Sequence, residues 1–376
     1  MNAKESLIQC AKKTGFDLVG VCGPEKFSRT EAELTRRQEQ GYQTPFTTAN
    51  IASRVNPNLV FPGVQAIISL GLSYVTNTAI TKSTPLKPDL KDRMARFAWG
   101  RDYHSVVREK QNLLMAEWQQ ALGHPVNWVA YVDTGPLAER EIAWRAGLGW
   151  YGKNCNLLNQ KLGSWFVLGE VLTDFYLEPD QPLENSCGTC DCCLQVCPAG
   201  ALEQPYRLNA YQCVSYLTQA PGFIPQHLRK AMGNQIYGCD LCQQVCPHNL
   251  QSGDNLSREF SSSQSETDLE KLLVLSNQEF KNTLGQTTAG WRGKKQLQRN
   301  AIIALGNSGS QLAVPALIKA LADSRPDIRG YAAWALGQIG GLQAKQALEM
   351  ALAKEPQQKV QAELTMALLN LEEQFK

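Results

Sequence analysis

Hydrophobic and polar positions follow helical and strand periods in turn over the first 180 residues. Helices are expected over 3–14, 28–40, 104–123 and 137–146, and strands over 16–22, 66–72, 126–132 and 164–172. The polar segments 50–57 and 81–91 are expected to be loops. Helices and strands mixed in this order predict an α+β domain over residues 1–180.

The pattern changes to runs of Ala and Leu near the C-terminus, where the sequence repeats. Residues 300–306 (NAIIALG) match residues 331–337 (YAAWALG), and a weaker third copy begins at Gln361. Stacked helix pairs repeat at such intervals, which predicts an α-helical, HEAT-like repeat domain over residues 281–376. The preceding region 251–280, rich in Ser, Gln and Asp over 251–268, is expected to be a linker.

The net charge of the chain is only +2, but one region is strongly basic. Residues 280–322 contain six Lys and Arg and no acidic residue. Four of the basic residues cluster beside Trp291, namely Arg292, Lys294, Lys295 and Arg299. Such a run is usually a solvated surface, although basic side chains beside an aromatic ring also suit phosphates and unstacked bases. The residues alone leave a solvated surface and a nucleic-acid contact equally open.

No segment has the character of a signal peptide or of a membrane-spanning helix. The first residues lack an apolar core, and the apolar run 66–75 is about half as long as a spanning helix. We therefore expect a cytoplasmic chain that does not bind a membrane, in a compartment where thiols stay reduced.

Cysteines are concentrated between residues 187 and 246, with the spacing that holds [4Fe–4S] clusters. The first run has the form C-x2-C-x2-C-x3-C-P and consists of Cys187, Cys190, Cys193 and Cys197. This is the bacterial ferredoxin spacing. The second run consists of Cys239, Cys242 and Cys246. It lacks a first cysteine, and Cys213 is the candidate that completes the set.

The fourth cysteine of each run is expected to ligate the other cluster, as in two-cluster ferredoxins. The first cluster is therefore assigned to Cys187, Cys190, Cys193 and Cys246, and the second to Cys197, Cys213, Cys239 and Cys242. Zinc sites prefer two separated C-x2-C pairs, and disulfides need an oxidising compartment, so both alternatives fit less well. Cys192 is left over as a bystander thiol. The module is expected over residues 181–250.

Asp133 is the candidate acid of the N-terminal domain. It follows a predicted strand and precedes a Thr-Gly-Pro turn. A reduction needs a proton, and a carboxylic acid with a raised pKa is a suitable donor. An Asp in this position often only forms the turn, and the residues alone favour that role. Asp102, Glu139 and Glu141 are competing acids.

Five features together resemble the epoxyqueuosine reductase family over nearly the whole chain. They are the cysteine module, VDTGP at 132–136, AGLGWYGKN at 146–154, RFAWGRDYH at 96–104, and the WRGKK run that leads into the repeats. The cysteine module is also similar to that of reductive dehalogenases. The family resemblance implies reduction of epoxyqueuosine, at the wobble position of tRNA, to queuosine with loss of water. The implied cofactors are two [4Fe–4S] clusters and a cobalamin.

The resemblance also implies roles for particular residues. Asp133 becomes the proton donor and a cofactor contact, and Arg54 contacts the cobalamin. Weaker cofactor contacts are implied at Leu157, Leu168, Ser215 and Asp240. The basic run Arg292, Lys294, Lys295 and Arg299 is implied to hold the tRNA anticodon stem-loop with its GUN anticodon. An external electron donor is implied, and we expect a monomer.

Two other functions remain as alternatives. A corrinoid-dependent reductase of a small molecule would have no salt-sensitive affinity for RNA. A ferredoxin-like electron carrier with a repeat docking scaffold would hold clusters but no corrinoid.

Overall fold

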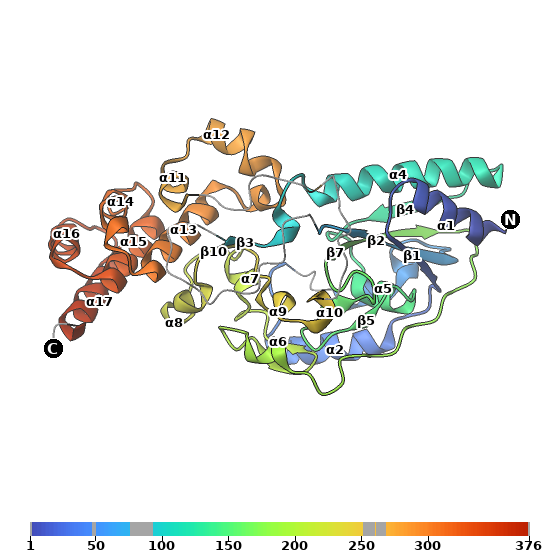
Figure 1. The fold of residues 1–376 in the computed structure, drawn as a ribbon, viewed down its shortest axis with the longest axis horizontal. Coiled ribbons are helices and arrows are strands. Elements are labelled where there is room, and N and C mark those ends of the chain that lie inside the picture. Colours follow the sequence, from blue (N-terminus) through green and yellow to red (C-terminus); the bar gives the residue numbers. More distant parts are fainter. Residues whose placement is uncertain (1, 47–49, 76–92, 251–259, 261–267, 375–376) are drawn as a thin grey trace. The chain divides into compact units, whose positions relative to one another are not determined.

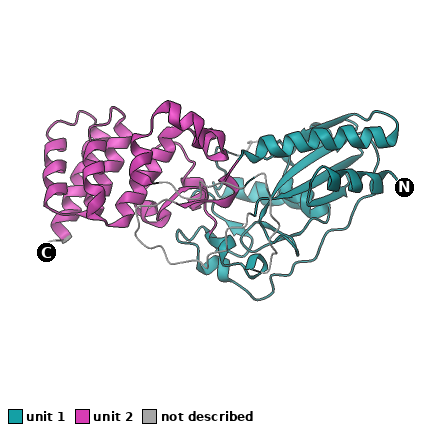
Figure 2. Ribbon diagram, turned by 45° about the horizontal axis from the view of Figure 1, so that its top comes forward, with its two compact units in different colours: residues 1–80, 101–211, 241–261 teal, residues 81–100, 212–240, 262–376 magenta. Residues whose placement is uncertain are grey.

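The computed structural model describes residues 2–46, 50–75, 93–250, 260 and 268–374, which form two compact units (Figures 1 and 2). Unit 1 comprises residues 1–80, 101–211 and 241–261, and unit 2 comprises residues 81–100, 212–240 and 262–376. The expected loop 81–91 lies outside the described residues, as do residues 251–259 and 261–267 of the expected linker 251–280. The rest of that expected linker contains the helix Leu269–Val274 and the start of the helix Asn277–Asn282.

Unit 1 combines one four-stranded sheet with helices and the first cysteine run. Its helices are α1 Ala3–Lys13, α2 Ser28–Glu39, α3 Ile51–Val55, the 3₁₀ helix η1 Pro57–Leu59, α4 Tyr103–Leu122, α5 Glu139–Arg145, α6 Cys192–Gln195, α9 Leu241–Gln244 and α10 Pro247–Leu250. Its strands are β1 Leu18–Cys22, β2 Ala66–Ser73, β4 Trp128–Tyr131, β5 Trp150–Tyr151, β6 Leu157–Leu158, β7 Phe166–Thr173, β8 Leu202–Gln204 and β9 Arg207–Leu208.

The sheet of unit 1 has the strand order β1-β2-β7-β4, and every neighbouring pair is antiparallel. All residues of β2 are buried, because the sheet is covered on both faces. Helices α1 and α4 pack on one face and α5 on the other. Burial on both faces explains why β2 is a continuous apolar run in the sequence.

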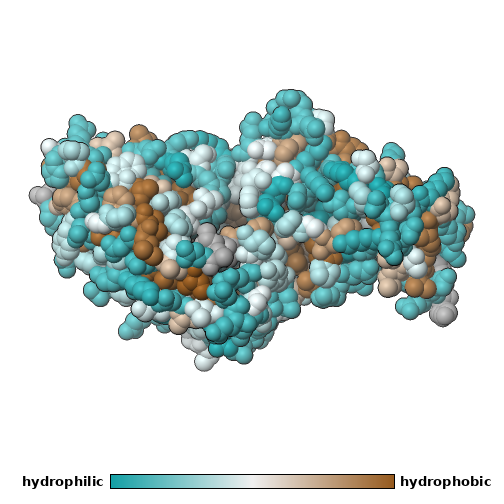
Figure 3. All heavy atoms as spheres, turned by 180° about the vertical axis from the view of Figure 1, so that it is seen from behind, coloured by the Kyte–Doolittle hydropathy of each residue, from teal (hydrophilic) through white to brown (hydrophobic). Residues whose placement is uncertain are grey.

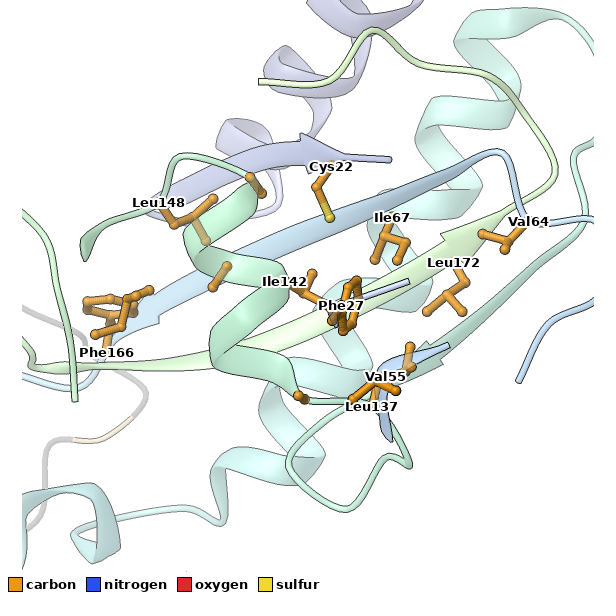
Figure 4. Packing of buried hydrophobic residues seen from close by; sticks show 14 of the residues in the cluster. Cys22, Phe27, Val55, Val64, Ile67, Leu137, Ile142, Leu148, Phe166 and Leu172 are labelled. Atoms are coloured by element: carbon orange, nitrogen blue, oxygen red, sulfur yellow. The ribbon is translucent and has the colours of Figure 1, made fainter. Parts of the chain in front are cut away.

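A hydrophobic cluster packs α5 onto the sheet. Ile142 packs with Phe27 and Val55 over Ile67 and Leu172 of the sheet (Figure 4). The segment between β4 and α5 is thereby held at one edge of the sheet, beside α3. This segment contains Asp133.

The expected loop over 50–57 is wrong, because α3 and η1 occupy it. Asn50 caps α3 by accepting a hydrogen bond from the backbone N–H of Ser53. Asn56 accepts one from Asn58, and Pro57 begins η1. Asn at an N-cap and Pro at the first helical position are ordinary start signals, and here they begin two helices of one turn each.

Unit 2 contains a two-stranded sheet and the C-terminal helices. Its strands are β3 Arg93–Met94 and β10 Gln235–Tyr237, which pair in parallel. Its helices are η2 Arg96–Ala98, α7 Val214–Leu217, α8 Gln226–Arg229, η3 Lys230–Met232, α11 Leu269–Val274, α12 Asn277–Asn282, η4 Leu284–Gln286, η5 Thr288–Arg292, α13 Lys294–Ser308, η6 Gln311–Ala313, α14 Val314–Ala320, α15 Pro326–Ile339, α16 Leu342–Leu352 and α17 Gln358–Gln374.

The sequence repeat marks the close packing of successive inner helices. A Cβ added at Gly306 of α13 would lie 2.8 Å from the Cα of Ala335 in α15. A Cβ added at Gly337 of α15 would lie 2.7 Å from the Cβ of Ala367 in α17. The equivalent glycines therefore allow each inner helix to approach the next, as stacked helical repeats require.

Segment 212–240 of the cysteine-rich region belongs to unit 2. The guanidinium of Arg229 donates to the carboxylate of Glu363 in α17 at 2.6 and 2.8 Å, and both side chains are nearly buried. The observed units thus divide the expected cysteine module between them. A domain predicted as one continuous stretch of sequence cannot include a contact such as Arg229 with Glu363, because the two residues are more than a hundred positions apart.

The surface is mostly hydrophilic on the face shown in Figure 3, where hydrophobic residues form separate patches. In the part of the chain that the structure describes, no helix has both the length and the apolar character needed to cross a membrane.

Candidate functional site

The four cysteines assigned to the first cluster lie near one another in unit 1. Cys246 is buried against Trp150 and Leu158, and Cys187 packs against the same group. Burial, and then the neighbouring thiols of Cys246, Cys187 and Cys190, raise the pKa of Cys193 to about 11. The cysteine before Pro247 thus lies beside the first run, and its ligation of the first cluster stays a prediction.

Cys192 has a different setting from these four. It is exposed, and its Sγ lies 3.6 Å from Sγ of Cys190. Within the described residues, no three His, Cys, Asp or Glu side chains converge tightly enough to hold a single metal ion. A [4Fe–4S] cube instead takes four separate thiolates.

Polar side chains from the sheet domain hold the cysteine loops of unit 1. Nζ of Lys153 donates to the carbonyl oxygens of Gly188 and Cys190, both at 2.7 Å. Asn249, just after Cys246, accepts the backbone N–H of Ser164 at 2.6 Å and donates to the carbonyl of Gln243 at 2.7 Å. This role of Lys153 was not predicted from the sequence. The glycine-rich turn before it, in which Gly149 allows β6 to approach closely, was the available signal.

The four cysteines assigned to the second cluster are shared between the units. Cys197 and Cys242 belong to unit 1, and Cys213 and Cys239 belong to unit 2. Their joint ligation of one cluster stays a prediction.

Arg299 and Asn300 of α13 hold the segment of unit 2 that carries Cys213 and Cys239. Nδ2 of Asn300 donates to the carbonyls of Thr218 and Ile236, both at 2.7 Å. The guanidinium of Arg299 donates to the carbonyls of Leu217, Thr218 and Ala220. Arg299 is only 3% exposed. This corrects the prediction that Arg299 contacts RNA, because its donors already bind backbone carbonyls inside the protein.

Replacing Arg299 with Leu should therefore destabilise the protein. Several buried carbonyls would lose their donors, at a cost of about 3 kcal/mol in the free energy of unfolding. Thermal unfolding measures this, with the exposed Lys354→Ala as the control. An unchanged melting temperature for Arg299→Leu would contradict the anchoring role.

The other residues of the basic run remain at the surface or near it. Lys295 is half exposed and pairs with Asp327 at 2.7 Å. Nζ of Lys294 donates to the carbonyl of Leu275, and Nε of Arg292 donates to the carbonyl of Gln219. Trp291 is 57% exposed, and the Arg292 guanidinium lies 4.6 Å from its ring centroid. An exposed ring beside basic groups persists in the structure as the sequence suggested.

Asp133 lies two residues beyond the end of β4 in the left-handed backbone region, with φ of 56°. Asp tolerates this region better than most residues with a Cβ, and such positions cluster at functional sites. Its Oδ2 accepts a hydrogen bond from the hydroxyl of Tyr103 at 2.9 Å and lies 3.4 Å from Nε2 of His104. Both partners stand at the N-terminus of α4.

The pKa of Asp133 is lowered, which corrects the expectation that it is raised. Burial acts to raise it, but the hydrogen bonds from His104 and Tyr103 outweigh burial. Solvent reaches the side chain, which is 59% exposed, so water screens part of the desolvation. Asp133 is therefore ionised at neutral pH in this structure.

His104 lies between two carboxylates. Its Nδ1 lies 2.7 Å from Oδ1 of Asp102, and Nε2 faces Asp133. Burial acts to lower the pKa of His104, but the bonds to Asp102 and Asp133 raise it to about 9. His104 therefore holds a proton at neutral pH. No role of His104 was predicted from the sequence, although its position two residues after Asp102, at the expected start of a helix, could have indicated one.

Two further carboxyl groups lie behind Asp133. Burial, and then the charge of Asp133, raise the pKa of Glu139 to about 8. Burial raises the pKa of Glu170 well above its usual value, and neither of its carboxyl oxygens has a partner in the described structure. Glu170 of β7 pairs in register with Tyr131 of β4, which brings it to this end of the sheet. Glu170 was not predicted as a site residue, because a single Glu within an apolar strand only weakly indicates a functional role.

Arg54 joins the same region through α3. Its carbonyl accepts the backbone N–H of Ala138 at 3.0 Å, directly before Glu139. Its Nε is buried and has no partner among the described residues, and burial lowers its pKa. A buried donor without a partner is costly, so this position is suited to a ligand.

The remaining cofactor candidates fall into two groups. Leu157 is buried in β6, and Leu168 of β7 packs against the cluster around α5. Ser215 and Asp240 belong to unit 2, where Oδ2 of Asp240 accepts the backbone N–H of Arg96 at 2.7 Å. Contact of these four residues with one cofactor stays a prediction.

Three family models match separate parts of the chain. Residues 54–134 match "Epoxyqueuosine reductase QueG, DUF1730", residues 186–249 match a 4Fe-4S double cluster binding domain, and residues 292–369 match HEAT repeats. The iron–sulfur and repeat assignments made from the sequence are consistent with these matches.

Similar proteins extend the match to the full length. The epoxyqueuosine reductase of Bacillus cereus is 38% identical over 97% of this chain and 96% of its own. A crystal structure of epoxyqueuosine reductase with an epoxyqueuosine-modified tRNA stem loop has a TM-score of 0.92 and 38% identity, and covers 99% of this chain and 100% of that chain. A Bacillus subtilis epoxyqueuosine reductase structure, in which a catalytic aspartate loop is swung out of the active site, has a TM-score of 0.92 at 37% identity, covering 98% and 100%. With this identity over almost the whole length, the chain belongs to the epoxyqueuosine reductase family.

Proposed function

We propose that this protein reduces epoxyqueuosine to queuosine in tRNA, using two [4Fe–4S] clusters and a cobalamin. The observation that carries this proposal is the full-length match, in sequence and fold, to an epoxyqueuosine reductase solved with its modified tRNA stem loop. The substrate assignment rests on that relative. The residues around Asp133 and the cysteines are the parts of this chain that would perform the reaction.

The cysteines of unit 1 support the first cluster. Cys187, Cys190, Cys193 and Cys246 lie close together, and Lys153 and Asn249 fix their loops. We propose the second cluster at Cys197, Cys213, Cys239 and Cys242. Thiolates arranged in this way hold clusters that accept and pass on one electron at a time.

The surroundings of Asp133 fit a bound cofactor such as cobalamin. Nε of Arg54 and Oε1 of Glu139 are both buried and lack partners among the described residues. When bound, cobalamin supplies a cobalt centre that delivers electrons to the substrate. We propose Arg54, Asp133, Leu157, Leu168, Ser215 and Asp240 as its contacts.

Asp133 is suited to act on the epoxide oxygen. Its carboxylate is reached by solvent, and Tyr103 and His104 fix its position. A carboxyl group held in this way can deliver a proton to an oxygen as a carbon–oxygen bond breaks. Because Asp133 is ionised in this structure, it has to take up a proton before it can deliver one.

The basic run of unit 2 is suited to bind the anticodon stem-loop. Arg292, Lys294 and Lys295 present positive charge beside the exposed ring of Trp291. Phosphates contact basic side chains, and unstacked bases stack on aromatic rings. The buried Arg299 is not part of this proposal.

Replacing Lys294 and Lys295 together with Ala should weaken tRNA binding and reduce its salt dependence. Each lost phosphate contact should flatten the plot of log K against log salt by about 0.7–0.9. Binding titrations at several salt concentrations measure the slope, with Lys354→Ala as the matched control. A slope equal to that of the unmodified protein would show that the two lysines are only a solvated surface.

The proposed function can be tested in cells that lack their own enzyme for this step. Expression of the chain should replace epoxyqueuosine by queuosine in digested tRNA, detected by mass spectrometry. Expression of the Asp133→Asn variant at the same level should leave epoxyqueuosine in place. Unchanged epoxyqueuosine with the unmodified chain, despite intact clusters, would contradict the proposal.

A further inference from the structure

The conversion of an epoxide to an alkene and water has a fixed proton requirement. Two carbon–oxygen bonds break and one carbon–carbon π bond forms, while two electrons and two protons are consumed. The electrons come from an external one-electron donor through the clusters, if the proposed function is correct. The protons have to come from groups beside the epoxide, and a single ionised Asp133 holds neither of them.

His104 is placed to give a proton to Asp133. Nε2 of His104 lies 3.4 Å from Oδ2 of Asp133, and the ring is stacked on Tyr103 with centroids 4.1 Å apart. Asp102 fixes the opposite nitrogen at 2.7 Å. Both ring nitrogens thus face carboxylates, an arrangement that suits the protonated imidazolium.

Glu139 contacts Asp133 from the other direction. Its carboxyl group accepts a hydrogen bond from the backbone N–H of Asp133, while Oε1 is buried without a partner among the described residues. One oxygen is therefore fixed beside Asp133, and the other is in a site that disfavours a negative charge. This arrangement suits a neutral carboxylic acid.

The charged groups around these two residues have opposing effects. Arg140 and Arg54 favour the ionised form of Glu139, and Asp133 disfavours it. Glu170 is buried behind them, next to Ser69 in the sheet, and oxygens of both side chains lack partners among the described residues. Burial, and then the charge of Glu139, in turn raise the pKa of Glu170. Around His104, the facing groups are Asp102, Asp133 and Tyr103.

We propose that Asp133 passes on protons which His104 and Glu139 hold, and that these two residues supply the two protons consumed in each turnover. In this scheme Asp133 delivers one proton to the epoxide oxygen as the first carbon–oxygen bond breaks. It is then reprotonated and delivers the second as the remaining carbon–oxygen bond breaks and water leaves. His104 ends as neutral imidazole and Glu139 as carboxylate, and solvent restores both protons.

Proton donation by His104 and Glu139 predicts that the rate of reduction falls as the pH rises. A donor acts only while it holds its proton, so the rate falls as the pH rises through the pKa of the donor. The pKa of Glu139 is raised to about 8 and that of His104 to about 9, by the causes given above. The single-turnover rate should therefore decline above about pH 8.

The test compares Glu139→Gln and His104→Gln with the unmodified protein in single-turnover reduction of a modified stem loop. Gln keeps the shape of Glu139 and its acceptor for the Asp133 N–H but carries no titratable proton. Each variant should be slower by about 10²-fold, and Glu139→Gln should lose the decline near pH 8. The exposed Glu109→Gln, on α4, is the control and should follow the unmodified protein.

A spectroscopic titration provides a readout that does not depend on turnover. The infrared carbonyl absorption of protonated carboxylic acids should lose one component near pH 8 in the unmodified protein, and this loss should be absent in Glu139→Gln. If Glu139→Gln has the rate and pH profile of the unmodified protein, or if the unmodified protein loses no component near pH 8, the proton-supply proposal is overturned while the proposed function stands. If the unmodified protein leaves epoxyqueuosine intact, both proposals fall.

Discussion

Replacing Cys246 with Ala removes one of the two iron–sulfur clusters, so iron falls from about eight to about four atoms per chain. Cys246 is buried beside Cys187 and close to Cys193, whereas Cys192 of the same unit is exposed. Iron and sulfide analysis after anaerobic reconstitution measures the loss. Turnover with an external electron donor should be abolished, because electrons pass through the clusters.

Cys192→Ala is the matched control for this experiment. The residue lies within the same run, but it is exposed and outside the assigned set. This variant should keep all its iron and its activity. Full iron content in Cys246→Ala, or an equal loss in Cys192→Ala, would contradict the assignment of ligands.

Replacing Asp133 with Asn should slow reduction by about 10²–10⁴-fold without loss of clusters or tRNA affinity. Asn is isosteric and tolerates the left-handed backbone at this position, so the fold should be kept. It can neither donate an acidic proton nor accept one from His104. Single-turnover rates measure the effect.

The cluster content and the tRNA dissociation constant of Asp133→Asn are its internal controls. If both match the unmodified protein while the rate falls, the effect lies in the chemical step. A rate equal to that of the unmodified protein would remove Asp133 from the mechanism.

Strands and helices could be predicted from the sequence where burial gives a regular pattern of apolar residues. β2 lies between two layers and is therefore a continuous apolar run, and the repeat glycines Gly306 and Gly337 mark helix contacts at a regular interval. The short helices at 51–59 were missed because one-turn helices have too few residues to show a period. Their capping residues Asn50 and Asn56 are equally typical of loops.

The sequence predicted which residues form the candidate site better than it predicted the role of each residue. The cysteine spacing is local and carries its chemistry directly. Arg299 was assigned to RNA because it belongs to a basic run, but its burial depends on segment 212–240, far away in the sequence. The lowered pKa of Asp133 likewise depends on His104 and Tyr103. These two residues lie beside Asp133 because α4 packs against the sheet.

The requirement for clusters and cobalamin can be measured with the purified chain, reconstituted with iron and sulfide and then assayed for reduction of an epoxyqueuosine-containing stem loop with and without cobalamin. We expect a product lighter by one oxygen atom only when cobalamin is present. The same yield without cobalamin, or no product when clusters and cobalamin are both bound, would contradict the proposed function.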